Sequence, residues 1–309
     1  MSTSPLIQVE ELARLLANVP ASLPHPADPP GQPVILDVRY RMNGDNGRRE
    51  FERAHIPGAS YVDMNTELAT IRPDAVGGRH PMPTTETFTA AMRSVGVTMS
   101  RPVVAYDDWA SLPASRLWWM LRRAGFLDVR VLDGGIAAWT AAGAPTESGP
   151  CPLGAGDFSP TSLGIGRLLD ATDAASYAAR HVLLDARSAD RFRGENETID
   201  PVAGHIPGAV SAPALANIDS SGRFLTADEL AGQFPQLGTT LWQGDARPRH
   251  PADASTPSAE RRVGTYCGSG IQATHLALAL SVAGITDDAD VYIGSWSDWI
   301  TDPARPVEV

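Results

Sequence analysis

Short apolar runs alternate along the chain with longer apolar stretches, and this alternation predicts the secondary structure. The short runs lie at residues 34–39, 103–106, 182–187 and 263–266. Runs of this length are typical of buried strands, whereas the stretches 117–121 and 273–283 indicate buried helices. Strands that alternate with helices predict an α/β fold with a mostly parallel sheet flanked by helices.

The same pattern occurs twice in the same order, which indicates an internal duplication, a tandem repeat. Both 34–39 and 182–187 end in Asp-x-Arg, and a His-Ile-Pro-Gly-Ala turn follows each of them. The matching segments are 34–39 and 182–187, 55–59 and 205–209, 103–106 and 263–266, and 134–139 and 294–299. Residues 242–260, rich in Pro, Ala, Asp and Ser, predict a surface insertion that only the second copy contains.

The boundary between the copies is predicted from composition. Residues 141–166 are dense in Gly, Pro and Ser, which is typical of a linker. We therefore predict an N-terminal domain at 1–145, a linker at 146–166 and a C-terminal domain at 167–309. Cys151 lies in the linker, where we interpret it as an incidental thiol.

The candidate chemistry lies at residues 267–273, between a predicted strand and a predicted helix. The loop begins Cys267-Gly268-Ser269-Gly270. Glycines let successive backbone N–H groups turn inward at a helix N-terminus, where they attract an anion and lower the pKa of a cysteine. The loop alone leaves open a second interpretation, in which a small buried cysteine precedes a helix. Asp107 occupies the equivalent position in the first copy, so we predict that only the C-terminal domain is catalytic.

Composition excludes several classes of function. The net charge of −11 argues against broad binding to nucleic acid or anionic membranes. Two cysteines exclude a disulfide framework, and no Cys/His cluster has the spacing of a zinc site. No apolar run reaches the ~18 residues of a membrane span, and residues 1–10 lack the pattern of a signal peptide. A cytoplasmic protein is the resulting expectation.

The tandem units resemble the two-domain rhodanese-type sulfurtransferases. The resemblance rests on the paired Asp-x-Arg strand ends, the paired His-Ile-Pro-Gly-Ala turns and the single cysteine before a helix in the second unit. It implies two rhodanese-like domains with the site at their interface. The loop from Cys267 to Ile271 looks like the Cys-Gly-Ser-Gly-Val loop of 3-mercaptopyruvate sulfurtransferases. Thiosulfate sulfurtransferases tend to carry Cys-Arg-Lys-Gly-Val instead, and Gln272 departs from the Thr usual in both groups.

The resemblance implies a nucleophile and its supporting groups. Cys267 is expected to attack the donor sulfur and carry it as a persulfide. The expected backbone donors to this sulfur belong to Gly268, Gly270, Ile271, Gln272 and Ala273. A cysteine phosphatase would need Arg where Ala273 stands, so phosphatase chemistry is not expected.

The resemblance also implies a serine–histidine–aspartate relay that protonates the pyruvate enolate. The matching positions are Ser269, His55 and Asp45. The alternative for His55 is a structural role that braces the turn before Pro57, which is the role expected of its duplicate His205.

Substrate contacts are predicted at three further positions. Arg187 and Arg191 are candidates for binding the donor carboxylate, with an ion pair as the alternative for each. Tyr106 is a candidate contact from the first domain, with packing as its alternative.

These residues together predict a sulfurtransferase that moves sulfur from 3-mercaptopyruvate to a thiol, such as thioredoxin or a low-molecular-weight thiol, or to cyanide. No metal or organic cofactor is expected. A thiosulfate:cyanide sulfurtransferase is the first alternative. A non-enzymatic sulfur carrier or docking module is the second, and an activated thiol argues against it.

Overall fold

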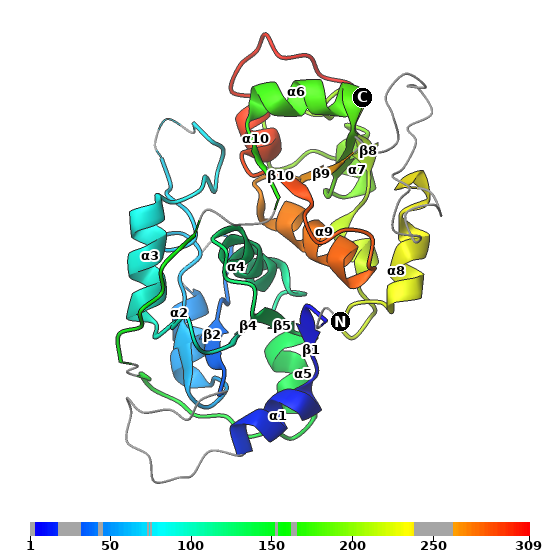
Figure 1. Cartoon of the computed structure of the whole chain (residues 1–309). Coiled ribbons are helices and arrows are strands. Elements are labelled where there is room, and N and C mark those ends of the chain that lie inside the picture. The colour runs from blue at the N-terminus through cyan, green and yellow to red at the C-terminus, as the bar shows by residue number, and fades with distance from the viewer. Residues whose placement is uncertain are drawn as a thin grey trace. The chain divides into compact units, whose positions relative to one another are not determined.

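The structure is a computed structural model that describes residues 4–17, 32–42, 46–72, 74, 76–151, 154–161, 166–237 and 262–309. Asp45 and the predicted insertion 242–260 lie outside the described residues. The chain forms two compact units (Figure 1). The N-terminal unit comprises Met1–Thr70, Pro83–Gly164 and Ser220–Arg223, and the C-terminal unit comprises Ile71–Met82, Ile165–Asp219 and Phe224–Val309.

Each unit contains one five-stranded parallel sheet, as the sequence predicts. The first sheet has the order β1-β5-β4-β2-β3 and the second has the order β6-β10-β9-β7-β8, so the two topologies are the same. The strands are β1 (Leu6–Ile7), β2 (Val34–Asp37), β3 (Ala59–Tyr61), β4 (Val103–Tyr106), β5 (Val129–Leu132), β6 (Leu168–Leu169), β7 (Val182–Asp185), β8 (Val210–Ser211), β9 (Val263–Tyr266) and β10 (Asp290–Tyr292).

Helices flank the sheets, and the most buried helix of each unit follows its central strand. In Figure 1, α4 follows β4 and α9 follows β9, and each helix contacts its preceding strand. The α-helices are α1 (Val9–Ala17), α2 (Asn46–Arg53), α3 (Thr85–Ser94), α4 (Leu112–Arg123), α5 (Gly135–Ala141), α6 (Ala171–Arg180), α7 (Ala189–Phe192), α8 (Ala227–Gln233), α9 (Ile271–Val282) and α10 (Ser295–Trp299). Two 3₁₀ helices lie at Ala214–Asn217 and Pro235–Leu237. No described helix is long and apolar enough to span a membrane.

Tryptophans anchor corresponding places in the two cores. Trp139 and Trp299 are buried, and each indole N–H donates to the carbonyl of a following proline, Pro145 at 2.7 Å and Pro306 at 3.0 Å. A buried indole requires such a partner for its polar nitrogen. The internal duplication is therefore visible in individual hydrogen bonds as well as in the sheet order.

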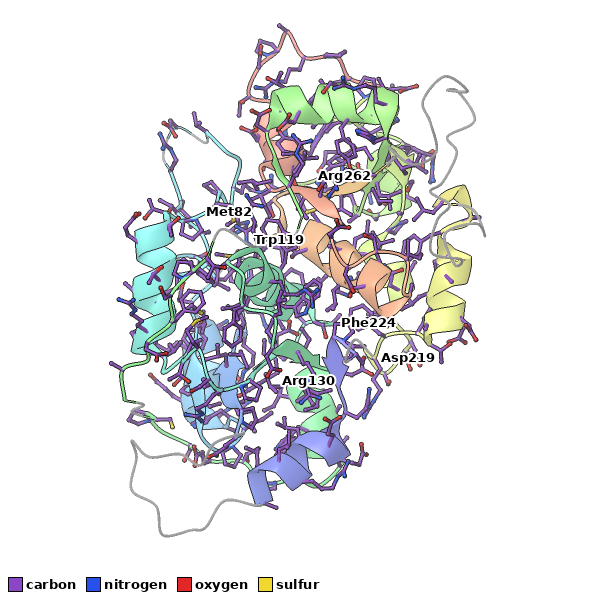
Figure 2. All side chains as sticks on the ribbon, viewed as in Figure 1. Met82, Trp119, Arg130, Asp219, Phe224 and Arg262 are labelled. Atoms are coloured by element: carbon purple, nitrogen blue, oxygen red, sulfur yellow. The ribbon has the colours of Figure 1, made fainter. Side chains whose placement is uncertain are left out.

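One segment belongs to the C-terminal unit although it precedes β4 in the chain. This segment, Ile71–Met82, ends at Met82, which Figure 2 labels. The Gly77 N–H donates to Asp298 Oδ1 at 3.0 Å, and the Arg79 N–H donates to Ser297 Oγ at 3.0 Å. A Cβ at Gly78, whose φ is +84°, would meet the carbonyl oxygen of Gly294 at 2.3 Å. Only glycine permits this close approach, which fixes the segment beside α10.

Candidate active site

Cys267 lies between β9 and α9, where the loop directs a backbone donor at its sulfur. The side chain is buried, and the Gly270 N–H donates to Cys267 Sγ at 3.0 Å. Gly270 precedes α9 with a φ of +89°, a conformation that glycine adopts without strain. The sulfur therefore lies at the N-terminus of a twelve-residue helix, which carries a partial positive charge.

The start of α10 supports this loop through hydrogen bonds. The Cys267 N–H donates to Ser295 Oγ at 3.0 Å, and Ser295 Oγ lies 3.9 Å from the sulfur. The Trp296 and Ser297 N–H groups donate to the carbonyls of Cys267 and Gly268, at 2.9 and 3.0 Å. Ser295 has a φ of +55°, which costs a residue with a side chain on the order of 1 kcal/mol or more.

Ser295 is a site residue that sequence reasoning missed, although the duplication contains a signal for it. Gly135 has the same place in the first copy and a φ of +56°. A Cβ on Gly135 would meet the Asp107 carbonyl at 2.1 Å, so the first copy excludes any side chain there. The second copy alone has a hydroxyl at this position.

Of the backbone donors predicted around the sulfur, the structure places the Gly270 N–H on it. Gly268, Ile271 and Ala273 are buried beside the cysteine, and Gln272 is half-buried in the first turn of α9. Ser269 is also half-buried, two residues after the nucleophile. No group of three or more His, Cys, Asp or Glu suited to a metal ion occurs in the described part of the chain.

Two arginines lie beside the loop, and one of them was not predicted. A Cβ built on Gly268 would lie 3.0 Å from Arg79 Nη2, 3.4 Å from Arg191 Nη1 and 3.6 Å from Arg191 Nη2. Arg191, a predicted substrate residue, is therefore next to the cysteine loop. Its Nε and Nη2 donate to Glu197 at 2.9 to 3.1 Å, and Nη2 also donates to Asp200 at 2.9 Å.

Arg187, also predicted to face the substrate, is fully buried and braces the turn of its own unit. It donates from Nε and Nη2 to Asp185, at 2.7 to 3.1 Å, and from Nη2 to the Gly204 carbonyl at 2.7 Å. Burial lowers the pKa of Arg187, but the charge and hydrogen bond of Asp185, together with Tyr266 and Glu197, raise it overall. Arg39 makes the same bonds to Asp37 and to the Ala54 carbonyl in the other copy. This repetition favours a structural role over substrate binding for Arg187.

His55 lies in the N-terminal unit, in a buried and well-packed place. Its Nδ1 is 2.7 Å from the Phe51 carbonyl, its ring stacks on Phe51 at 4.0 Å, and its Nε2 lies 3.3 Å from Glu147. The contacts that the structure shows for His55 all lie within this unit, whereas Ser269 belongs to the C-terminal unit. Asp45 lies outside the described residues, so the relay of Ser269, His55 and Asp45 stays a prediction.

His205, the duplicate of His55, makes matching contacts within its own unit. Its Nδ1 is 2.8 Å from the Phe192 carbonyl, its ring stacks on Phe192 at 3.7 Å, and its Nε2 lies 3.8 Å from Glu308. A relay histidine would be expected to differ from a copy that has no such task. The equality of the two sites favours the structural role for His55.

Tyr106 is also matched by its duplicate. Its hydroxyl accepts the Ile56 N–H at 3.2 Å, just as the Tyr266 hydroxyl accepts the Ile206 N–H at 3.2 Å. Both tyrosines are fully buried, and burial raises the pKa of each well above its usual value. The packing interpretation is therefore favoured over a substrate contact for Tyr106.

The equivalent loop of the N-terminal unit holds a carboxylate of its own. Asp107 accepts the N–H groups of Trp109 at 2.8 Å, Ser111 at 3.0 Å and Ala114 at 2.9 Å. Burial raises the pKa of Asp107 to about 6, against the lowering effect of these bonds. The loop thus uses its backbone donors on an internal side chain, which agrees with the prediction that this copy is not catalytic.

Comparison with known proteins places the chain in a family. Residues 23–142 and 165–302 each match the rhodanese-like domain. A Mycobacterium tuberculosis protein, provisionally named thiosulfate sulfurtransferase SseB, is 39% identical over 282 residues, covering 90% of this chain and 91% of that protein. A Pseudomonas aeruginosa protein, provisionally named 3-mercaptopyruvate sulfurtransferase, is 38% identical over 314 residues and 99% of both chains.

A solved structure agrees in fold over nearly the whole length. The crystal structure of SseA from Escherichia coli, titled as a 3-mercaptopyruvate sulfotransferase, has a TM-score of 0.74 and 28% identity, covering 96% of this chain and 100% of that one. Both repeats are included in this match. The chain therefore belongs to the rhodanese-like family, as a protein with two such domains in tandem.

Proposed function

We propose that the protein is a sulfurtransferase that moves a sulfane sulfur from 3-mercaptopyruvate, through a persulfide on Cys267, to a thiol or cyanide acceptor, with release of pyruvate. The observation that carries this proposal is the buried Cys267 sulfur, which receives the Gly270 N–H at 3.0 Å where α9 begins. The thiolate is the nucleophilic form of cysteine, and the Gly270 N–H at the start of α9 is placed to donate to it. The names of the relatives agree with this chemistry.

The first half-reaction loads the enzyme. The Cys267 thiolate attacks the donor sulfur, so an S–S bond forms and the C–S bond of the donor breaks. The electron pair of the C–S bond leaves on carbon as the enolate of pyruvate, which then takes up a proton. Ser269 remains our candidate for delivering that proton, because its half-buried side chain lies two residues after the nucleophile. The participation of His55 and Asp45 remains a prediction.

The second half-reaction unloads the enzyme. An acceptor thiolate attacks the outer sulfur of the Cys267 persulfide, leaves with that sulfur as a persulfide of its own and restores the Cys267 thiolate. Cyanide would leave as thiocyanate in the same way. Thioredoxin and low-molecular-weight thiols are the acceptors we propose, and the expected cytoplasmic location would supply both.

Thiosulfate is the second candidate donor. Thiosulfate is a dianion, and the guanidinium groups of Arg79 and Arg191 both lie beside Gly268. The provisional name of the M. tuberculosis relative also refers to thiosulfate.

Steady-state kinetics with each donor and a common thiol acceptor test the proposal. We expect kcat/KM to favour 3-mercaptopyruvate by tenfold or more, which corresponds to ~1.4 kcal/mol in the transition state. Cys267→Ser should abolish turnover and the persulfide seen by mass spectrometry, while Cys151→Ser, the matched control, should change neither. A preference for thiosulfate would replace the donor assignment. Persulfide formation without turnover would support the non-enzymatic carrier.

A further inference from the structure

We propose that Arg79 is a specificity-determining residue that, together with Arg191, binds the anionic group of the sulfur donor above Gly268. This inference rests on the proposed function in so far as the donor is an anion. It assigns a role to a residue that lies far from the cysteine loop in the sequence.

The backbone of Arg79 is held firmly against the catalytic loop. Its own N–H donates to Ser297 Oγ, while the Ser297 N–H donates to the Gly268 carbonyl, both at 3.0 Å. Ser297 therefore links Arg79 by two hydrogen bonds to Gly268, the residue that follows Cys267. The neighbouring Gly78 packs on the Gly294 carbonyl too closely for any side chain, which leaves little freedom for the segment.

Asp200 orients the guanidinium groups of both arginines. One carboxylate oxygen, Oδ1, pairs with Arg79 Nη1, and the other, Oδ2, accepts from Arg191 Nη2 at 2.9 Å. The Asp200 side chain is only 2% exposed, whereas the exposed fractions are 33% for Arg79 and 12% for Arg191. A buried carboxylate that bridges two partly exposed arginines is suited to hold their remaining donors in fixed directions.

One further nitrogen of each guanidinium group lies close to the same residue, Gly268. Arg79 Nη2 and Arg191 Nη1 take no part in the bonds to Asp200 and Glu197, and they lie 3.0 and 3.4 Å from where a Cβ on Gly268 would stand. Because Gly268 has no side chain, both nitrogens can approach the backbone of the loop closely. Two guanidinium donors of this kind match the two oxygens of a carboxylate.

The two arginines beside Gly268 change how the sequence of the cysteine loop is interpreted. Thiosulfate-type loops supply a cation from the residue after the cysteine, whereas this chain has glycine there and places two cations at the same position from other segments. The absence of a charged residue in the loop does not indicate an uncharged site. We therefore infer that donor choice depends on Arg79 and Arg191, and on Asp200 as the residue that positions them.

Kinetics of Arg79 variants test this inference directly. For Arg79→Ala we expect kcat/KM for 3-mercaptopyruvate to fall about 10- to 100-fold, mainly through KM, as is typical for the loss of a charge-assisted hydrogen bond. Arg79→Lys should recover part of the loss, because it keeps the charge without the planar fork. Arg72→Ala is the matched control, since Arg72 is an exposed residue of the same segment that pairs with Asp74. A change below twofold in Arg79→Ala would overturn the inference.

Alkylation of Cys267 supplies a readout that does not depend on the donor. We expect the rate ratio of iodoacetate to iodoacetamide at Cys267, followed by peptide mass spectrometry, to fall about tenfold or more in Arg79→Ala, since only iodoacetate carries a carboxylate. An unchanged ratio would contradict the inference even if the wild type uses 3-mercaptopyruvate. A lowered ratio in an enzyme that does not use this donor would support the anion site and reject the proposed donor.

Asp200→Asn separates positioning from charge. Loss of the bridging carboxylate should lower kcat/KM for 3-mercaptopyruvate about tenfold, because the two guanidinium groups lose their common acceptor. The iodoacetate preference should not fall, because both positive charges remain. If kcat/KM and the iodoacetate preference fall together, Asp200 acts only by supporting the local fold. That result would remove Asp200 from the proposed site.

Discussion

The loops that follow β4 and β9 occupy equivalent positions in the two copies but differ in the side chain that accepts their backbone N–H groups. In the first, the Asp107 carboxylate lies within the loop and accepts three backbone N–H groups. In the second, the Cys267 thiol accepts one, from Gly270, and two arginines lie beside the next residue. The comparison shows that both loops direct backbone N–H groups at the side chain that follows the central strand. The first copy meets these donors with a carboxylate of its own, whereas the second directs one of them at a thiol and has two arginines nearby.

Removing the internal carboxylate is the largest expected effect. Asp107→Ala leaves three buried N–H groups without their acceptor, which should lower the free energy of unfolding by about 3 kcal/mol or more. Asp108→Ala is the matched control, because Asp108 forms a partly exposed ion pair with Arg41, and its loss should cost under about 1 kcal/mol. Urea unfolding of both variants measures the difference. Equal losses of stability in the two variants would mean that the loop does not depend on the Asp107 carboxylate.

The same variant gives a pH dependence with a definite sign. Burial raises the pKa of Asp107 from its usual 3.8 to about 6 in the folded protein, so the folded state binds this proton more tightly than the unfolded chain does. The contribution of Asp107 is then fully present below pH ~4 and decreases as the pH rises through about 6. The stability advantage of the wild type over Asp107→Ala should therefore shrink between pH 4 and pH 7. An advantage that grows over this range would contradict the raised pKa.

His55 and His205 provide the next comparison between the copies, with an expected effect of intermediate size. If both brace their turns, His55→Gln and His205→Gln should each lower the free energy of unfolding by about 1–2 kcal/mol, with similar small changes in kcat. A relay role would instead lower kcat at least tenfold in His55→Gln alone. Thermal unfolding and single-turnover kinetics on both variants separate the two roles.

The smallest expected difference concerns the position shared by Gly135 and Ser295. Ser295→Ala keeps the strained φ of +55° and removes the acceptor of the Cys267 N–H, whereas Ser295→Gly removes the strain as well. We expect the glycine variant to be more stable than the alanine variant by about 1 kcal/mol. Both variants should lose turnover, because the Cys267 backbone loses its hydrogen bond. Equal unfolding midpoints would show that the backbone at this position is unstrained.

Much of the architecture follows from the sequence because the pattern occurs twice. The paired Asp-x-Arg strand ends locate β2 and β7, and the apolar run after Cys267 locates α9. The placement of Arg191 beside the loop also agrees with the sequence interpretation. These features depend on local spacing, which a single sequence contains.

The remaining features depend on contacts between distant segments. Nothing near Arg79 in the sequence indicates that its segment packs beside α10. The catalytic role of His55 stays a prediction, and within their own units His55 and His205 make matching contacts. Comparing the copies position by position, which pairs Gly135 with Ser295, is the signal that sequence reasoning left unused.

The assignment of Ile71–Met82 to the C-terminal unit, and of Ser220–Arg223 to the N-terminal unit, has a consequence for any division of the chain. Each repeat includes a segment encoded within the other half of the gene. A cut at the linker would give a C-terminal fragment that lacks Ile71–Met82, and with it Arg79. Each unit, as it now folds, therefore takes residues from both halves of the chain.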